Sequence, residues 1–499
     1  MDLKSEPRII YQNFRSKQID KAYAINLLIS IIQNSSNVNL RTRSLDFLLK
    51  VEPSDEKIFH LLENLFISDS DEEIRRIAGN MLRILFQEKA IEPMRWALEH
   101  EESLGVLISI FSNLAEFTSE KSETILKKEL NNIDSSRLEH YLESFFNTEH
   151  IENLTIKQIS NIIINHLIIS RLRLKFGYVK FEIDKGVISK LDLSNVDNLG
   201  FGFTKLEDFI NNILSLSYLE KLDLRFNNLI KIPGSIQESE SLKFLDLSFN
   251  RLLHLPQSLN SLISLEVLNL KSNRLVSLPN SIGSLSALKK LNLRSNKLTK
   301  LPQSFSSLNN LEYLDLHGNK IESFPSNFSK LINLKYLELG WNKFDHFPES
   351  VLDLNLKNLG LSGNKKIKML PISINHLNSL KRLDLHDNSI TYLPESIGDM
   401  VNLEKLNLRN NQLKELPISM RKLKNLKVLN LSWNNINELP VWIMDLTSLE
   451  ELNLWDNQIS SIPEILKNHP TLKLLNLKFN EIEELPSSFQ NFNKYTIKQ

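Results

Sequence analysis

Cysteine is absent from the 499 residues of the chain, and glycine occurs only 13 times. Without cysteine there can be no disulfide, no thiolate ligand for zinc or an iron–sulfur cluster, and no thiol nucleophile. Phosphate-binding loops need clustered glycines, and neither GxxxxGKS/T nor GxGxxG occurs in the sequence. The sequence therefore excludes thiol chemistry and gives no support to a nucleotide-dependent enzyme.

The chain also lacks an excess of charge and a long hydrophobic run. Its 60 Lys and Arg residues balance 60 Asp and Glu residues, so net charge gives no long-range attraction to nucleic acid or an anionic membrane. The first ten residues contain no apolar signal-peptide core. The apolar runs 25–32 and 162–169 are shorter than the roughly 18–20 residues of a membrane span. We expect a cytoplasmic protein that has no membrane span and binds no nucleic acid.

The prolines reveal an internal repeat. Twelve of the 16 prolines recur at an interval of 23 residues, from Pro233 to Pro486. Around them the pattern L-x-x-L-x-L-x-x-N-x-L begins at Leu219 and occurs in twelve successive units. At one slip in this pattern, the unit 334–355 is one residue shorter than the others, and the next unit, 356–379, is one residue longer. A period between roughly 20 and 29 residues with this pattern is typical of leucine-rich repeats.

The stacking of such units predicts a role for each position. Leu222 and Leu224 alternate with outward side chains on a short strand, so both leucines point into the core. Successive strands then form a parallel sheet on the concave side. We expect Asn227 and its equivalents to bond backbone groups of neighbouring turns, because an unpaired buried N–H group costs about 1–3 kcal/mol. The Leu-Pro step predicts extended backbone on the convex side.

The complete unit resembles the intracellular 23-residue leucine-rich-repeat class, which includes Ras-pathway scaffolds and plant intracellular Ras-group proteins. The resemblance covers residues 219–494, and the stretch 279–301 lies close to a consensus. It implies a curved solenoid that binds another protein and has no catalytic activity of its own. It also implies a small GTPase or a signalling enzyme as the class of partner. It does not extend to the longer units of Ran GTPase-activating proteins.

The residues before the repeats have helical spacing of apolar side chains. Windows 37–51 and 71–85 share one pattern of apolar, small and arginine residues, which resembles the second helix of HEAT-like repeats. A generic helical bundle is the alternative for this region. The predicted fold class is therefore an α/β leucine-rich-repeat solenoid preceded by an all-α, HEAT-like domain.

Five segments follow from these patterns, and stacked repeats need capping at both ends. A strand pattern around the turn at Lys185 and Gly186 predicts a hairpin at the start of the solenoid, and Phe489, Phe492 and Tyr495 are expected to cover its C-terminal end. The segments are HEAT-like helices at 1–118, a helical extension at 119–176, a cap hairpin with a degenerate first repeat at 177–218, twelve repeats at 219–494 and a tail at 495–499.

The candidate binding residues lie on or beside the outward face of the predicted strands. Tryptophan and arginine dominate the energetics of protein interfaces, and an exposed tryptophan is costly unless a partner covers it. For Phe226, Phe249 and Phe479, packing against neighbouring turns is an equal alternative. The partner-binding candidates are Arg225, Phe226, Phe249, Arg294, His317, Trp341, His386, Arg409, Trp433, Trp455 and Phe479.

No pattern typical of catalysis or metal binding occurs. The 11 histidines lack metal-ligand spacing, and His317 and His386 occupy equivalent positions three repeats apart. We therefore expect no metal, no cofactor and no enzymatic activity. The predicted function is a protein-binding scaffold or adaptor in intracellular signalling. The alternative is a regulatory subunit whose helical domain binds the partner while the solenoid serves as a spacer or support.

Overall fold

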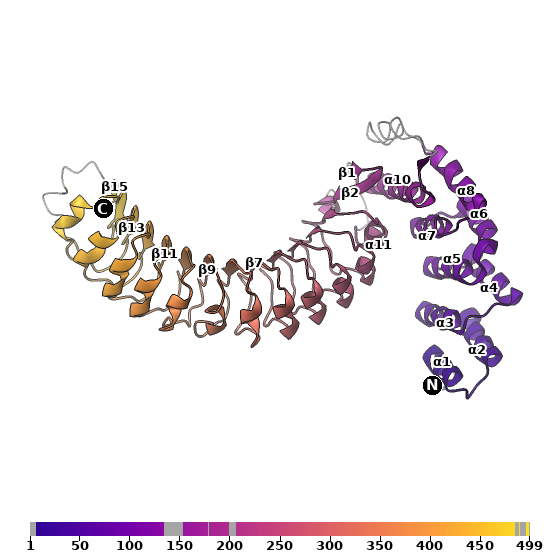
Figure 1. Cartoon of the computed structure of the whole chain (residues 1–499), viewed down its shortest axis with the longest axis horizontal. Coiled ribbons are helices and arrows are strands. Elements are labelled where there is room, and N and C mark those ends of the chain that lie inside the picture. The colour runs from indigo at the N-terminus through magenta and orange to yellow at the C-terminus, as the bar shows by residue number, and fades with distance from the viewer. Residues whose placement is uncertain are drawn as a thin grey trace. The chain divides into compact units, whose positions relative to one another are not determined.

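The computed structural model of the chain describes residues 6–133, 153–177, 179–198, 206–484, 489 and 496–498. The chain divides into two compact units (Figure 1). The first, called the helical unit here, comprises residues 1–191, 201–204 and 208–218. The second, called the solenoid, comprises residues 192–200, 205–207 and 219–499.

The helical unit begins with stacked helix pairs, of which α2–α3 and α4–α5 are the most extensively packed. In Figure 1, α3, α5 and α7 follow one another in one row, and α2, α4 and α6 follow in the other. The described helices are α1 (Pro7–Arg15), α2 (Lys21–Asn34), α3 (Val38–Val51), α4 (Glu56–Ser68), α5 (Glu72–Phe86), α6 (Ile91–His100), α7 (Leu104–Leu114), α8 (Glu120–Asn131), α10 (Ile156–Phe176) and α11 (Ile210–Leu214).

The two sequence windows that share a pattern correspond to α3 and α5. Each helix begins after a side chain that caps it: the Asn37 side chain accepts a bond from the Leu40 N–H, and Asp71 accepts from the Ile74 N–H. Ser44 and Ala78, at equivalent places, are completely buried. The all-helical character of this region is confirmed, and the HEAT-like class stays a prediction.

The shared pattern also contains an arginine with the same role in both windows. Arg41 pairs with Asp69, which precedes α5. Arg75 makes two bonds of 2.8 and 3.0 Å to the carboxylate of Glu101, which precedes α7. Each arginine therefore links its own helix pair to the next one, as a stacked helical repeat requires.

The helical unit ends with a long helix packed against a hairpin. Strand β1 (Lys180–Asp184) is followed by β2 (Val187–Asp192), as the turn at Lys185 and Gly186 predicts. The Asn165 side chain of α10 accepts a bond of 2.6 Å from the Ile188 N–H. The Arg173 guanidinium lies 5.1 Å from the ring centre of Phe181. These polar contacts tie the hairpin to α10.

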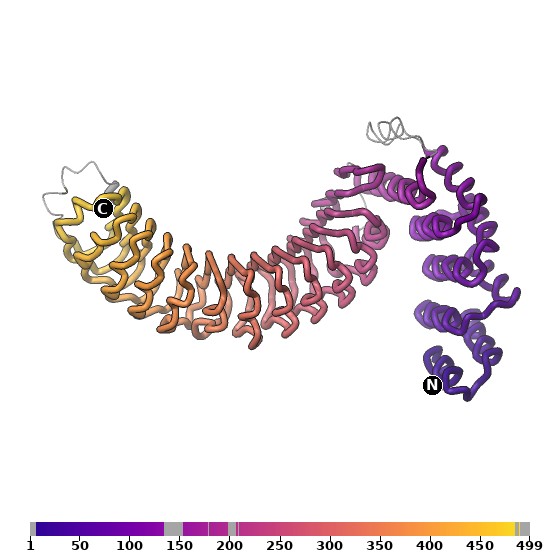
Figure 2. The backbone as a smooth tube through the Cα atoms, in the orientation of Figure 1, coloured from indigo at the N-terminus to yellow at the C-terminus, as the bar shows by residue number. Residues whose placement is uncertain are grey.

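The solenoid is a parallel sheet in which each strand lies beside the next one along the chain. The register is constant, so that Leu222 lies opposite Leu245 and Leu245 opposite Leu268. Figure 2 shows the backbone of these repeats as successive similar coils. Its strands are β3 (Lys221–Asp223), β4 (Phe244–Asp246), β5 (Val267–Asn269), β6 (Lys290–Asn292), β7 (Tyr313–Asp315), β8 (Tyr336–Glu338), β9 (Asn358–Gly360), β10 (Arg382–Asp384), β11 (Lys405–Asn407), β12 (Val428–Asn430), β13 (Glu451–Asn453), β14 (Leu474–Asn476) and β15 (Thr496–Lys498).

The asparagine of each repeat bonds backbone groups in neighbouring turns. The Asn250 amide donates to the carbonyls of Leu224 and Leu247 at 2.9 and 3.0 Å. Its side-chain oxygen accepts a bond of 3.1 Å from the Leu229 N–H. One amide therefore satisfies three backbone groups over two repeats, which is the role that the sequence predicts.

The convex side carries short 3-10 helices after the Leu-Pro steps. Pro233 has an extended backbone with ψ 161°, and η7 (Gly234–Glu238) follows it. Most of the later repeats place a 3-10 helix directly after the proline in the same way, up to η17 (Glu464–Asn468). The apolar residues of these helices, such as Ile236, complete the core behind the sheet.

The C-terminal end differs from the sequence prediction in one element. Residues 496–498, expected to belong to a tail, form β15, which pairs in parallel with β14 and extends the sheet by one strand. Phe489 is buried, as expected for a residue that covers the last repeat. Phe492 and Tyr495 lie outside the described residues, as does Tyr178 of the cap hairpin.

Candidate binding surface

The candidate residues occupy two neighbouring columns along the concave face, where the strands lie (Figure 1). The strand-end column holds the residue two places before each repeat asparagine, and the turn column holds the residue directly before it. In the strand-end column are Arg225, Arg294, His317, His386, Arg409 and Trp455, and in the turn column are Phe226, Phe249, Trp341, Trp433 and Phe479.

The turn column has a left-handed backbone in all twelve repeats. The φ angles lie between 54° at Trp341 and 71° at Gly363. This conformation costs roughly 1–2 kcal/mol for a residue with a side chain, and glycine adopts it without that cost. Large aromatic residues at such positions carry strain that the fold does not require, and such strain is typical of functional surfaces. This feature was not predicted from the sequence, although Gly318, Gly363 and Asn410 at equivalent places could have indicated it.

Two aromatic residues form a stack near the N-terminal end of the solenoid. The rings of Phe226 and Phe249 lie nearly parallel, with centres 4.3 Å apart. The ammonium group of Lys271 lies 5.3 Å from the ring centre of Phe249. Both rings stay exposed, so the stack covers part of each ring and leaves an apolar surface beside a cation.

Three aromatic residues form a continuous row near the C-terminal end. The Trp433 and Trp455 ring centres are 5.6 Å apart, and those of Trp455 and Phe479 are 6.0 Å apart. The Arg409 guanidinium lies 5.8 Å from the ring centre of Trp433. Trp455 is half-buried between its neighbours, and its Nε1 group is buried without a hydrogen-bond partner among the described residues. All three members of this row are among the candidates that the sequence predicts.

Trp341 stands alone between these clusters, at the slip in repeat length. It is 48 % exposed, and it covers Gly363 of the next repeat. A Cβ atom at Gly363 would lie 2.8 Å from the Trp341 ring. The glycine is therefore required both by its φ of 71° and by the ring above it. At the slip, the side chains of Glu338 and Trp341 occupy the space above Gly360 and Gly363 of the next repeat.

An acidic group lies on the concave face beside Trp341. Glu338 lies between Asp315 of β7 and Gly360 of β9, and its side chain occupies the space above Gly360. Burial, together with the neighbouring charges of Asp315 and Asp384, raises the pKa of Glu338 to about 7. The centre of the face can therefore change its charge near neutral pH.

The two candidate histidines flank this acidic group and differ in environment. His386 Nδ1 lies 2.6 Å from the Asp384 carboxylate, and this hydrogen bond raises the pKa of His386. Burial and the nearby Arg294 lower the pKa of His317. Among the described residues, no group of three or more histidine, cysteine, aspartate or glutamate side chains has the geometry to hold a metal ion.

The candidate arginines of the N-terminal half bond to strand carboxylates. Arg225 lies 3.1 Å from Asp223, and Arg294 lies 4.0 Å from Asp315. The side chains of Arg225 and Arg294 are 45 % and 40 % exposed, so solvent screens both pairs and they contribute little to stability. Each can exchange its intramolecular carboxylate for one on a partner at a small net cost.

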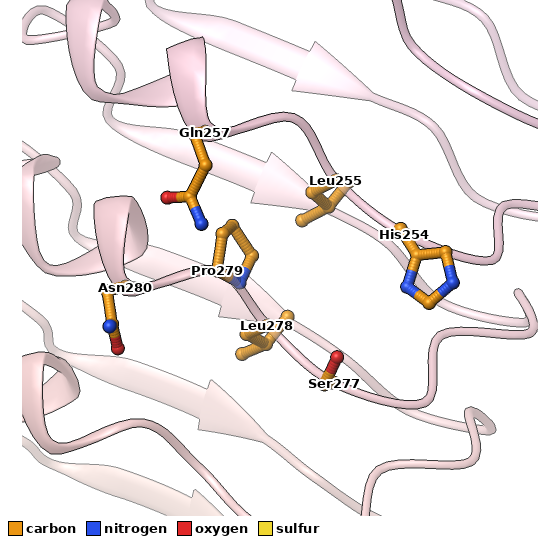
Figure 3. Close-up of a pocket in the computed structure, with 7 residues that line it drawn as sticks. All are labelled: His254, Leu255, Gln257, Ser277, Leu278, Pro279 and Asn280. Atoms are coloured by element: carbon orange, nitrogen blue, oxygen red, sulfur yellow. The ribbon is translucent and has the colours of Figure 1, made fainter.

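The other side of the repeats carries a shallow hollow of about 300 Å³, shown in Figure 3. It lies between the Leu-Pro steps of two successive repeats, with His254 and Ser277 at one end and Gln257 and Asn280 at the other. Its lining is mostly polar, and no charged cluster faces it.

No described helix is both long and apolar enough to cross a membrane.

Comparisons with known families match three parts of the solenoid. Residues 373–494 match the leucine-rich repeat region family, residues 256–321 the leucine rich repeat family, and residues 241–262 a further leucine rich repeat family. No enzyme family was found among these matches. A comparison with curated proteins gives no match.

Solved structures show the same fold. A leucine-rich-repeat protein of Leptospira interrogans is 33 % identical, with a TM-score of 0.52, over 58 % of this chain and 80 % of that one. An internalin of Listeria monocytogenes is 19 % identical, with a TM-score of 0.53, over 66 % of this chain and 93 % of that one. A TDR receptor is 29 % identical, with a TM-score of 0.51, over 58 % of this chain and 52 % of that one.

These findings agree with the strand pattern and the asparagine bonds described above. The predicted fold class, a parallel leucine-rich-repeat solenoid preceded by an all-helical region, is confirmed. The matches do not distinguish the Ras-related class from other members. The chain belongs to the leucine-rich-repeat proteins.

Proposed function

We propose that this chain is a non-enzymatic scaffold or adaptor that binds a protein partner through the concave face of its solenoid. The aromatic row of Trp433, Trp455 and Phe479 carries this proposal. Trp433 is 40 % exposed and Phe479 is 71 % exposed, and both adopt a left-handed backbone that a smaller residue would adopt at lower cost. Exposed aromatic residues beside an arginine are typical of an interface hot spot.

The partner class in this proposal is a small GTPase or a signalling enzyme. Its support is the resemblance of the 23-residue unit to the Ras-related class, and the matched families support protein binding in general. The repeats give a rigid surface, because each strand is fixed by its neighbours and by the asparagine bonds. Binding to a preordered surface avoids the entropy cost of ordering it.

The second candidate function places the partner on the helical unit, with the solenoid as spacer or support. One observation favours it: Trp96 of α6 is 45 % exposed and stacks on His100, with ring centres 4.0 Å apart. An exposed tryptophan outside the solenoid also meets the criterion for a binding residue. The two functions differ in which tryptophans the partner needs.

The test compares three forms of the full-length protein in affinity capture from native lysate. Trp433→Ala/Trp455→Ala should lose a partner that the unmodified protein retains, while Trp96→Ala, the control with an exposed tryptophan removed elsewhere, should retain it. The melting temperature of each variant shows whether the solenoid stays folded. Loss of the partner with Trp96→Ala alone would establish the second function, and a partner retained by all three proteins would contradict both.

A further inference from the structure

A row of basic residues lies beside the turn column, directly after the repeat asparagine. Six consecutive repeats have a lysine or an arginine at this place. The extra residue at the slip, Lys366, is a seventh cation. All seven are exposed, and none forms an ion pair with a described residue. This basic stripe consists of Arg251, Arg274, Lys297, Lys320, Lys343, Lys365 and Lys366.

A second row of lysines in the same solenoid shows how this fold neutralises repeated charge. In the residue before each strand, glutamate and lysine alternate over most of the array. Lys243 pairs with Glu220 at 2.7 Å, Lys289 with Glu266 at 2.9 Å, and Lys335 with Glu312 at 3.3 Å. In this column, a lysine therefore forms an ion pair with a glutamate of the neighbouring repeat. The basic stripe contains no glutamate in these repeats, and its charges repel one another.

The basic stripe is not a requirement of the repeat. The five repeats that follow it have Ser389, Gln412, Asn435, Gln458 and Glu481 at the same place, and their backbone follows the same register. Neutral and acidic residues at this place are thus compatible with the same backbone. A destabilising row of like charges that the fold does not need indicates a ligand of opposite charge.

Each end of the basic stripe lies at a hollow. At the N-terminal end, Arg251 and Arg274 line a hollow of about 510 Å³ together with Phe226 and Phe249. At the slip, Lys343, Lys365 and Lys366 line one of about 630 Å³. Two acidic residues, Glu322 and Asp345, also line the second hollow, and Asp345 pairs with His346. Cations of the basic stripe therefore border a hollow at each end of the stripe, and side chains of a ligand have room to enter both hollows.

We propose that the basic stripe is a second binding surface, separate from the aromatic row, for an extended acidic segment of a partner protein. Six strands at about 4.8 Å spacing span about 24 Å, which an extended chain of about eight residues covers. Carboxylates along that segment would neutralise the cations, and apolar side chains would enter the hollow beside Phe226 and Phe249.

A protein segment fits this surface better than a nucleic acid does. The basic stripe is a single row, whereas the adjoining strands carry Asp223, Asp246 and Asp315 on the concave face. A nucleic acid that also contacted the protein beside the basic stripe would bring its phosphates close to these carboxylates, which would repel them. An acidic peptide needs only the one row.

The experiment titrates the full-length protein into a fluorescein-labelled peptide of twelve glutamates and measures anisotropy at low and at physiological ionic strength. Lys297→Glu/Lys320→Glu changes two exposed side chains in the middle of the basic stripe. Lys405→Glu/Lys414→Glu is the matched control, because it changes net charge equally at exposed lysines outside the stripe. We expect the stripe variant to bind the peptide about tenfold or more weakly than the control, and added salt to weaken binding.

Two results would overturn the proposal: equal affinities of stripe and control variants, or tighter binding of a twelve-nucleotide single-stranded DNA than of the peptide. Trp433→Ala/Trp455→Ala should bind the peptide as the unmodified protein does. This last measurement separates the basic stripe from the proposed aromatic site, since either can fail alone.

Discussion

At the scale of single residues, the backbone of the turn column explains why the aromatic positions are unusual. Every repeat turns through a left-handed residue before its asparagine, whether that residue is glycine, serine, asparagine, aspartate, phenylalanine or tryptophan. At the slip, the same position must also leave room for the ring of Trp341. Backbone conformation and side-chain packing are therefore separable at Gly363.

Gly363→Ala should destabilise the solenoid more than Gly318→Ala does. Both glycines have positive φ, but a Cβ at Gly318 meets only ordinary contacts at 3.5 Å or more. We expect a loss of about 1 kcal/mol at Gly318 from the backbone alone and at least about 1 kcal/mol more at Gly363 from displacement of Trp341. Urea unfolding measures both. The double variant Gly363→Ala/Trp341→Ala should return to the Gly318→Ala level, and additive losses would contradict the packing explanation.

Glu338 gives a pH dependence with a definite sign. Its pKa is raised from 4.5 to about 7 in the folded protein, so the folded state holds its proton at pH values where the unfolded state has lost it. This contribution to stability is lost as pH rises from about 4.5 to about 7 and stays lost above that range. The free energy of unfolding of Glu338→Gln, measured with urea, should therefore exceed that of the unmodified protein at pH 8 by at most about 3 kcal/mol. At pH 4 the two proteins should be equally stable. An identical difference at both pH values would show that Glu338 does not titrate in this way.

At the scale of elements, the asparagine bonds hold successive repeats together. Among the repeats that the structure describes completely, one repeat asparagine lacks one of these hydrogen bonds, and it lies at the slip. Asn388 donates to the carbonyls of Leu361 and Leu385, but its buried oxygen accepts no hydrogen bond from a described residue. The residue inserted after Lys365 moves the backbone N–H that would reach it in a 23-residue unit.

Asn273→Ala should therefore cost more stability than Asn388→Ala. Asn273 donates to two carbonyls and accepts a bond of 3.0 Å from the Leu252 N–H. Its removal leaves three buried backbone groups unpaired, whereas removal of Asn388 leaves two. We expect the difference to be about 1 kcal/mol in the free energy of unfolding, measured with urea. A larger loss at Asn388 would mean that the slip is held by that side chain in another way.

Most elements of the solenoid could be predicted from the sequence, because each follows from the regular spacing of the repeats. The leucines, the asparagines and the extended Leu-Pro steps all have the predicted roles. The left-handed turn could not be predicted so directly, since phenylalanine and tryptophan disfavour that backbone. Strand β15 was missed because residues 496–498 lack the repeat pattern and pair with β14 only through the backbone.

At the scale of the whole molecule, a net charge of zero conceals an uneven distribution. The basic stripe and the acidic group around Glu338 lie within the same solenoid, and the net charge of the whole chain indicates neither. The net charge of the chain therefore gave no indication of the basic stripe. Trp433 and Trp455 could be singled out from the sequence because the repeat pattern places them outside the two core leucines; their role in binding stays a prediction. The cytoplasmic location and the Ras-related class stay predictions.

The measurement that tests the central claim most directly is site-specific photo-crosslinking of the full-length protein to its captured partner. A photoreactive residue at Asn430 stands on the concave face of β12, and one at Val441 stands at the exposed start of η16 (Val441–Asp445), on the other side of the same repeat. We predict that the partner crosslinks to position 430 and not to position 441. Crosslinking at 441 alone, or only at a third probe placed at Trp96, would contradict binding through the concave face.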